Sequence, residues 1–123
     1  MARLTRRVAL AIAALSAAAG LAACGGGVNA DAVAACHGVH RALAAYDRSL
    51  HATNAAARAA DLLDAQHQIA LEMHTAAMAN AQDGTYDALV TMMQQAQEVP
   101  FRNVAPALRA ECSTILSANG GYL

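Results

Sequence analysis

Apolar and polar residues follow a helical pattern along most of this chain after residue 30. Apolar side chains recur at intervals of three and four residues, which is the spacing of one face of an α-helix. The alternation with a period of two that marks strands is not visible, and β-branched and aromatic residues are sparse. Alanine, the best helix former, makes up about a quarter of the residues after Cys24. The pattern predicts an all-α fold.

Capping residues and helix breakers divide this pattern into four predicted helices. They cover about 31–50, 55–81, 85–97 and 103–118. Asn29 or Asp31 is expected to cap the first helix, and Thr53 or Asn54 the second. Four helices joined by short loops predict an antiparallel, up-down-up-down bundle.

Glycine and proline set the other helix ends. Gly84 ends the second predicted helix, and Thr85 can start the third. Pro100 prevents the third helix from continuing. The fourth is expected to begin at Asn103, with Pro106 in its first turn, where the missing N–H costs no hydrogen bond.

Each predicted helix has an apolar face that should enter the core. The apolar stripe of the first helix is Ala32, Cys36, Val39, Leu43, Tyr46 and Leu50. The second helix has two stripes, Ala55, Ala59, Leu62, Ile69, Met73 and Ala76 on one side and Leu63, His67, Leu71, His74 and Met78 on another. Its expected solvated sector is narrow and consists of Asp61, Asp64, Gln68, Glu72 and Thr75. A helix this apolar should pack against more than one neighbour.

The first 23 residues differ from the rest of the chain. MARLTRR carries three arginines, VALAIAALSAAAGL is an apolar run, and small residues precede Cys24. The run is shorter than the ~20 apolar residues that span a bilayer, and it suits a signal-peptide core. The junction Leu21-Ala22-Ala23-Cys24 resembles the lipobox of bacterial lipoproteins, which is an aliphatic residue, two small residues and a cysteine.

This resemblance implies that Cys24 is acylated and that a lipoprotein signal peptidase cuts between Ala23 and Cys24. The protein would then be anchored to membrane lipid at the extracytoplasmic face of the cell membrane, because each buried CH₂ group contributes about 0.8 kcal/mol. Residues 24–30 would form the lipidated cysteine and a glycine-rich tether, and 31–123 the bundle domain. The alternative is an ordinary secretory signal, cut after Ala23, that leaves Cys24 as a thiol.

Lipidation of Cys24 leaves an even pair of cysteines, Cys36 and Cys112. Both lie on predicted apolar stripes, near the start of the first helix and the end of the fourth. Those two ends share one pole of an antiparallel bundle with four helices. A disulfide between them would close a loop of about 77 residues and contribute roughly 4–5 kcal/mol in the chain-entropy model. We therefore expect a Cys36–Cys112 disulfide, which is permitted outside the cytoplasm.

The charge balance argues against nucleic acid as a partner. Beyond Cys24 the chain has five arginines, no lysine and all nine acidic residues, so this part is net negative. It offers no basic footprint for phosphates. No serine stands in a nucleophile-elbow context and no phosphate-binding loop follows a strand. The expected role is non-enzymatic binding or scaffolding at the membrane surface, with membrane lipid and an envelope protein as partners and no obligatory cofactor.

Histidine, methionine and tyrosine provide the alternative function, carriage of a metal ion or haem. His67, His74 and Met78 project from one side of the second predicted helix and suit copper, or else they line a groove between helices. Cys36 and His40 are spaced for zinc, but Cys112 competes for Cys36.

Tyr46 and His51 are candidate haem ligands. The segment YDRSLHATN, between two distant cysteines, is similar to small secreted haem carriers of mycobacteria. The alternative is that Tyr46 belongs to the core and that His51 caps the C-terminus of its helix, where a positive charge is favourable. CHGVH at 36–40 lacks the second cysteine of a covalent haem-attachment motif.

Overall fold

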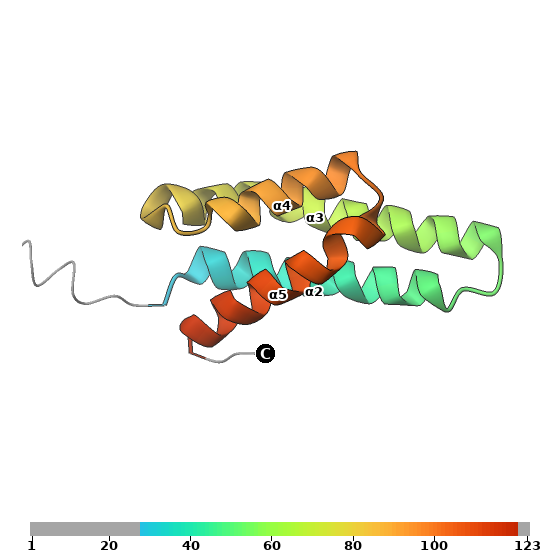
Figure 1. Ribbon diagram of the computed structural model, residues 1–123, viewed down its shortest axis with the longest axis horizontal. Helices are drawn as coiled ribbons and strands as arrows, with labels where there is room; N and C mark the ends of the chain where they lie inside the picture. Colours follow the sequence, from blue (N-terminus) through green and yellow to red (C-terminus); the bar gives the residue numbers. More distant parts are fainter. Residues whose placement is uncertain (1–27, 121–123) are drawn as a thin grey trace, which may run out of the picture.

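The computed structural model describes residues 28–120, which form four α-helices. They are α2 (Ala30–Leu50), α3 (Ala55–Asp83), α4 (Asp87–Glu98) and α5 (Phe101–Ala118), with no strand within residues 28–120. Consecutive helices run in opposite directions, and α5 returns to pack beside α2 (Figure 1). The predicted all-α, antiparallel four-helix bundle is confirmed.

Side-chain caps start the two long helices as predicted. Asn29 caps α2 and Asn54 caps α3, each accepting a hydrogen bond from the backbone N–H three residues later, at 3.0 and 2.8 Å. Gly84 ends α3 in the left-handed conformation, with φ of 49°, which favours glycine. The prediction for α4 is wrong, because its N-cap is Tyr86 rather than Thr85 and makes no side-chain capping bond.

The last helix starts two residues earlier than predicted. α5 begins at Phe101, directly after Pro100, and the ring of Phe101 is buried. Pro106 therefore lies inside the helix rather than in its first turn. There its missing N–H removes the bond that would reach the carbonyl of Arg102.

Small side chains form the contact between α2 and α3, and larger ones fill the centre of the bundle. The buried alanines of these two helices are Ala32, Ala35, Ala42 and Ala45 on α2 and Ala65, Ala76 and Ala79 on α3. The largest fully buried side chains are Ile69, Leu89, Met93, Leu108 and Leu116. Val104, Leu108, Cys112 and Ile115 form a buried stripe on α5.

The predicted disulfide is present and joins α2 to α5. The Cα atoms of Cys36 and Cys112 are 5.3 Å apart, and both side chains are buried. The backbone N–H of Asn29 also donates to Oδ1 of Asn119, at 2.8 Å. The start of α2 and the end of α5 therefore share one pole, as the cysteine positions predicted (Figure 1).

The acidic stripe of α3, predicted as its solvated sector, is partly exposed and lies at the edge of the contact with α2, where it pairs with arginines of that helix. Arg41 pairs with Glu72 at 3.0 Å, and Arg48 pairs with Asp64 at 2.8 Å and with Asp61 at 3.5 Å. The two arginines of α2 thus attract this side of α3 along the length of the contact.

The second predicted apolar stripe of α3 lies outward instead. Leu63, Leu71 and Met78 are 67, 57 and 44% exposed, and His67 and His74 on the same face are exposed as well. Within residues 28–120, α3 packs mainly against α2 and α4, and these two neighbours cover its other sides. The prediction that this stripe is buried is wrong.

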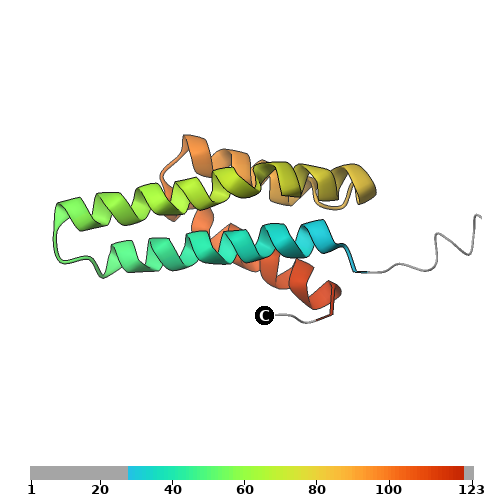
Figure 2. The ribbon, with the colours of Figure 1, turned by 180° about the vertical axis from the view of Figure 1, so that it is seen from behind.

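The far ends of α2 and α3 project beyond the rest of the bundle. α4 has 12 residues against 29 in α3, so the turn from α4 to α5 lies part of the way along the long hairpin (Figures 1 and 2). Leu50, which is 61% exposed, and Ala55 and Ala59 lie in this projecting part. All three were predicted to be buried, and the short α4 explains why they are not.

Gly38 on α2 leaves room for the side chain of Glu72 on α3. A Cβ atom added at this buried glycine would lie 2.0 Å from Cγ of Glu72 and 3.2 Å from its Cβ. The aliphatic part of Glu72 thus lies against the backbone of α2, while its carboxylate pairs with Arg41. A glycine inside a helix costs about 1 kcal/mol of helix stability relative to alanine. At position 38 this cost accompanies the contact between Glu72 and the backbone of α2.

Gly38→Ala is expected to lower the free energy of unfolding although alanine is the better helix former, because Glu72 must leave its place and give up Arg41. In a Glu72→Ala background the same substitution should be more favourable by about 1 kcal/mol, since most of the clash is gone. Urea denaturation followed by circular dichroism of the four proteins checks this. Equal effects of Gly38→Ala in both backgrounds would contradict the proposed contact.

Candidate functional site

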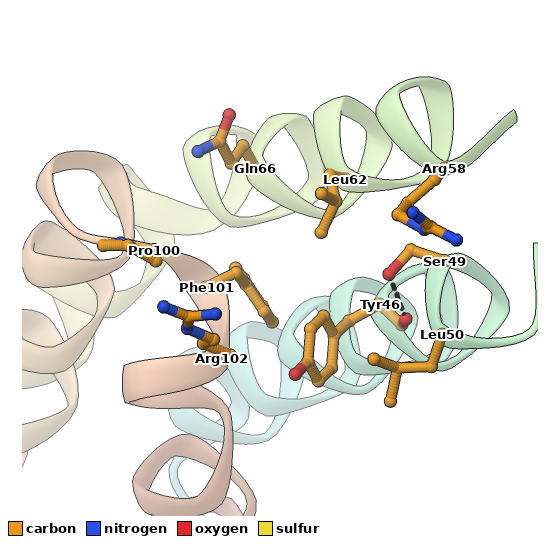
Figure 3. A pocket seen from close by; sticks show the side chains of 9 residues that line it. All are labelled: Tyr46, Ser49, Leu50, Arg58, Leu62, Gln66, Pro100, Phe101 and Arg102. Atoms are coloured by element: carbon orange, nitrogen blue, oxygen red, sulfur yellow. Dashed lines mark hydrogen bonds between the residues drawn. The ribbon is translucent and has the colours of Figure 1, made fainter. Parts of the chain in front are cut away.

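An open pocket lies where the α4–α5 turn leaves the long hairpin uncovered. Its volume is about 620 Å³, within the range of small-molecule sites. We call it the distal groove, because it lies at the pole opposite the shared ends of α2 and α5. Its lining residues are Tyr46, Ser49 and Leu50 of α2, Arg58, Leu62 and Gln66 of α3, Pro100, and Phe101 and Arg102 of α5 (Figure 3).

Two aromatic rings form the apolar wall of the distal groove. The ring centroids of Tyr46 and Phe101 are 5.3 Å apart, and the ring planes are tilted by 43°. Phe101 is buried, whereas Tyr46 is half-buried and packs against the core. Such tilted pairs are a favoured aromatic geometry, so the pair fixes α5 against α2 at this point.

The one serine that lines the groove, Ser49, forms a hydrogen bond with the backbone of its own helix. Ser49 is 2% exposed, and its hydroxyl donates to the carbonyl of Tyr46 at 2.5 Å (Figure 3). The groove therefore presents mainly hydrocarbon and aromatic surface from Tyr46, Leu50, Leu62 and Phe101.

Two arginines give the groove its charge. Arg58 and Arg102 line it and are exposed, and no acidic residue is among the lining residues. Within residues 28–120, the arginines that form ion pairs are Arg41, Arg48 and Arg109. Neither groove arginine has an acidic partner in that part of the chain. The groove is thus apolar inside and cationic at its edge.

The two predicted haem ligands differ in their surroundings. Tyr46 lines the distal groove, whereas His51 is not among its lining residues. His51 is the C-cap residue of α2, and its Nδ1 lies 2.8 Å from the carbonyl oxygen of Asp47. The alternative interpretation of His51 as a helix-capping residue is confirmed, and haem binding stays a prediction.

The predicted copper ligands share one outward face of α3. His67, His74 and Met78 are all exposed, so the alternative that they line a groove between helices is wrong. The two histidines are seven positions apart, which is about 10.5 Å along a helix. Between residues 28 and 120, no group of three or more His, Cys, Asp or Glu side chains is placed to hold a metal ion. Copper binding stays a prediction.

Zinc binding by Cys36 and His40 is wrong for the oxidised protein, because the disulfide occupies the sulfur of Cys36. His40 lies partly buried on α2. Burial, followed by the nearby His37 and Arg109, lowers the pKa of His40 below its ordinary value.

The lipidation site and cleavage junction at Ala23 and Cys24 lie outside the described residues, and these two assignments stay predictions. Of the helices within residues 28–120, none is both long and apolar enough to cross a membrane.

The sequence interpretation missed most of the distal groove. Of its lining residues the sequence pattern indicates only Tyr46 as a candidate ligand and places Leu50 and Leu62 in buried stripes. A signal was present in the Pro100-Phe101 pair, because the one phenylalanine of the chain follows a helix-breaking proline. The predicted helix start at Asn103 left that phenylalanine in a loop and hid its role.

Comparison of the chain with protein-family models, with curated proteins and with solved structures gave no match.

Proposed function

We propose that this chain is a bacterial cell-envelope lipoprotein whose helical domain binds an apolar small molecule in the distal groove and catalyses no reaction. The observation that carries the binding role is the open groove of about 620 Å³ with its aromatic and aliphatic wall. Clefts of this size lined by apolar side chains, with a few polar groups at the edge, are typical of small-molecule sites.

The position of the groove agrees with attachment through residue 24. The tether would enter the domain next to Asn29, whose backbone bonds to Asn119 at the end of α5. The distal groove lies at the other end of α2, around Tyr46 and Leu50. An anchored domain would therefore present the groove away from its lipid, where ligand can enter and leave.

Haem is a second candidate for the same groove. The phenol of Tyr46 belongs to the groove wall, and tyrosine is an established axial ligand of haem iron. Either Arg58 or Arg102 at the edge could pair with the propionate edge of the haem. This candidate uses Tyr46 of the predicted haem pair and does not need His51.

For the anchor, membrane-extracted protein is expected to exceed the mass of the 24–123 polypeptide by at least a diacylglyceryl group, as measured by intact-mass spectrometry. Cys24→Ala should abolish both the added mass and the cleavage, because the cysteine is the acceptor of the lipid. A bare 24–123 polypeptide would favour the ordinary secretory signal, and a chain with its initiating methionine would exclude both.

For the groove, a neutral fluorescent dye such as N-phenylnaphthylamine is expected to bind a chain that begins at Gly25, with increased emission in the apolar site. Leu62→Glu should weaken this binding at least about tenfold, because it places a charge on the groove wall. The matched control is Leu63→Glu, one residue away on the outward face of α3. Equal losses in the two variants would contradict binding in the distal groove.

For the haem candidate, titration of the same chain with haemin is expected to give a Soret shift that Tyr46→Phe abolishes while dye binding persists. Phenylalanine keeps the aromatic wall and removes only the oxygen ligand. A spectrum identical in the variant would remove haem as a ligand of Tyr46, and His51→Ala serves as the control that should leave it unchanged.

A further inference from the structure

The arginines of the described domain fall into two groups. Arg41, Arg48 and Arg109 each pair with a carboxylate of a neighbouring helix, at 2.8 to 3.5 Å. The other two, Arg58 and Arg102, have no acidic partner between residues 28 and 120, and both line the distal groove. Acids outnumber arginines in this part of the chain, yet its two unpaired arginines line the same groove.

Separate elements bring the two unpaired arginines to the groove. Arg58 lies one turn into α3 and Arg102 is the second residue of α5. Figure 3 shows them at opposite ends of the groove, with the rings of Tyr46 and Phe101 between them in this view. An anionic group at either end of an apolar ligand would therefore meet a guanidinium group at the edge.

Arginine is well matched to such a headgroup. Its planar guanidinium donates two parallel hydrogen bonds to a carboxylate or a phosphate, and it stays charged at any physiological pH. The side chains below it offer no acid that would repel an anion and no cationic group deep inside the groove. The guanidinium groups at the edge thus favour a ligand with an anionic head, and the apolar wall binds the body of that ligand.

We propose that the ligand of the distal groove is a single-chain amphipathic acid, with an alkyl body against Tyr46, Leu62 and Phe101 and a carboxylate or phosphate head at Arg58 or Arg102. This inference rests on the proposed binding function and specifies its ligand class. It requires that the groove distinguishes ligands by the charge of the head when the tail is the same.

The test uses displacement of N-phenylnaphthylamine from a chain that begins at Gly25, which contains every residue of the described fold and lacks the acyl chains that would compete. The competitors share one tail and differ in the head: dodecanoate, dodecyl phosphate, dodecanol and dodecyltrimethylammonium, all below micelle-forming concentrations. We expect the two anions to bind about tenfold more tightly than dodecanol, and the cation to bind least.

Arg58→Gln/Arg102→Gln is expected to abolish this preference while dodecanol and the dye still bind. The matched control is Arg41→Gln/Arg109→Gln, which changes the net charge equally but removes arginines that do not line the groove, and it should keep the preference. Raising the salt concentration should reduce the preference, because the arginines are exposed to solvent.

The outcomes separate this inference from the function on which it rests. Equal binding of dodecanoate and dodecanol, or a preference that survives in the double variant, would overturn the ligand class and leave the groove as a binding site. Failure of the dye and of all four competitors to bind would instead overturn the proposed function itself.

Discussion

The turn at Pro100 is the constraint on which the distal groove depends. The residue before a proline is held away from the helical conformation, and Val99 is extended, with φ of −118° and ψ of 161°. α4 therefore ends at Glu98, far short of the length of α3, and α5 starts back immediately with Phe101. The early return leaves the ends of α2 and α3 without a third and fourth helix above them. The uncovered space is the groove, and the buried ring of Phe101 forms part of its wall.

The opposite pole is closed by covalent and polar links. The Cys36–Cys112 disulfide and the Asn29–Asn119 hydrogen bond hold α5 beside α2 at the end where α2 begins. A disulfide that closes a loop this long restricts the unfolded chain strongly in the chain-entropy model, which matters for a domain of about a hundred residues. The molecule thus has one fixed end and one open end. This division fits the proposed attachment at one pole and the proposed binding at the other.

Much of the fold could be predicted from the sequence, because its signals are local. Asn29, Asn54 and Gly84 specify helix ends through their own side chains or backbone freedom, and the positions of Cys36 and Cys112 follow from counting antiparallel helices. The orientation of α3 could not be predicted in the same way. Its core face is Ala65, Ile69, Ala76 and Ala79, and the acidic stripe lies at the edge of the contact with α2, where it pairs with Arg41 and Arg48, while the Leu–His–Met stripe is exposed. The groove could not be predicted because it results from a difference in length between helices, and the Pro100-Phe101 pair, its one local signal, does not reveal that difference.

The central claim is that the distal groove is the place where a ligand binds, and nuclear magnetic resonance tests it most directly. An isotope-labelled chain that begins at Gly25 would be titrated with dodecanoate while its amide and methyl signals are followed. We predict that the shifted signals belong to the amides of the groove residues Tyr46, Ser49, Leu50, Arg58, Leu62, Gln66, Phe101 and Arg102 and to the methyl groups of Leu50 and Leu62. Shifts confined to Leu63, Leu71 and Met78 on the outward face of α3, or no shifts at all, would contradict it.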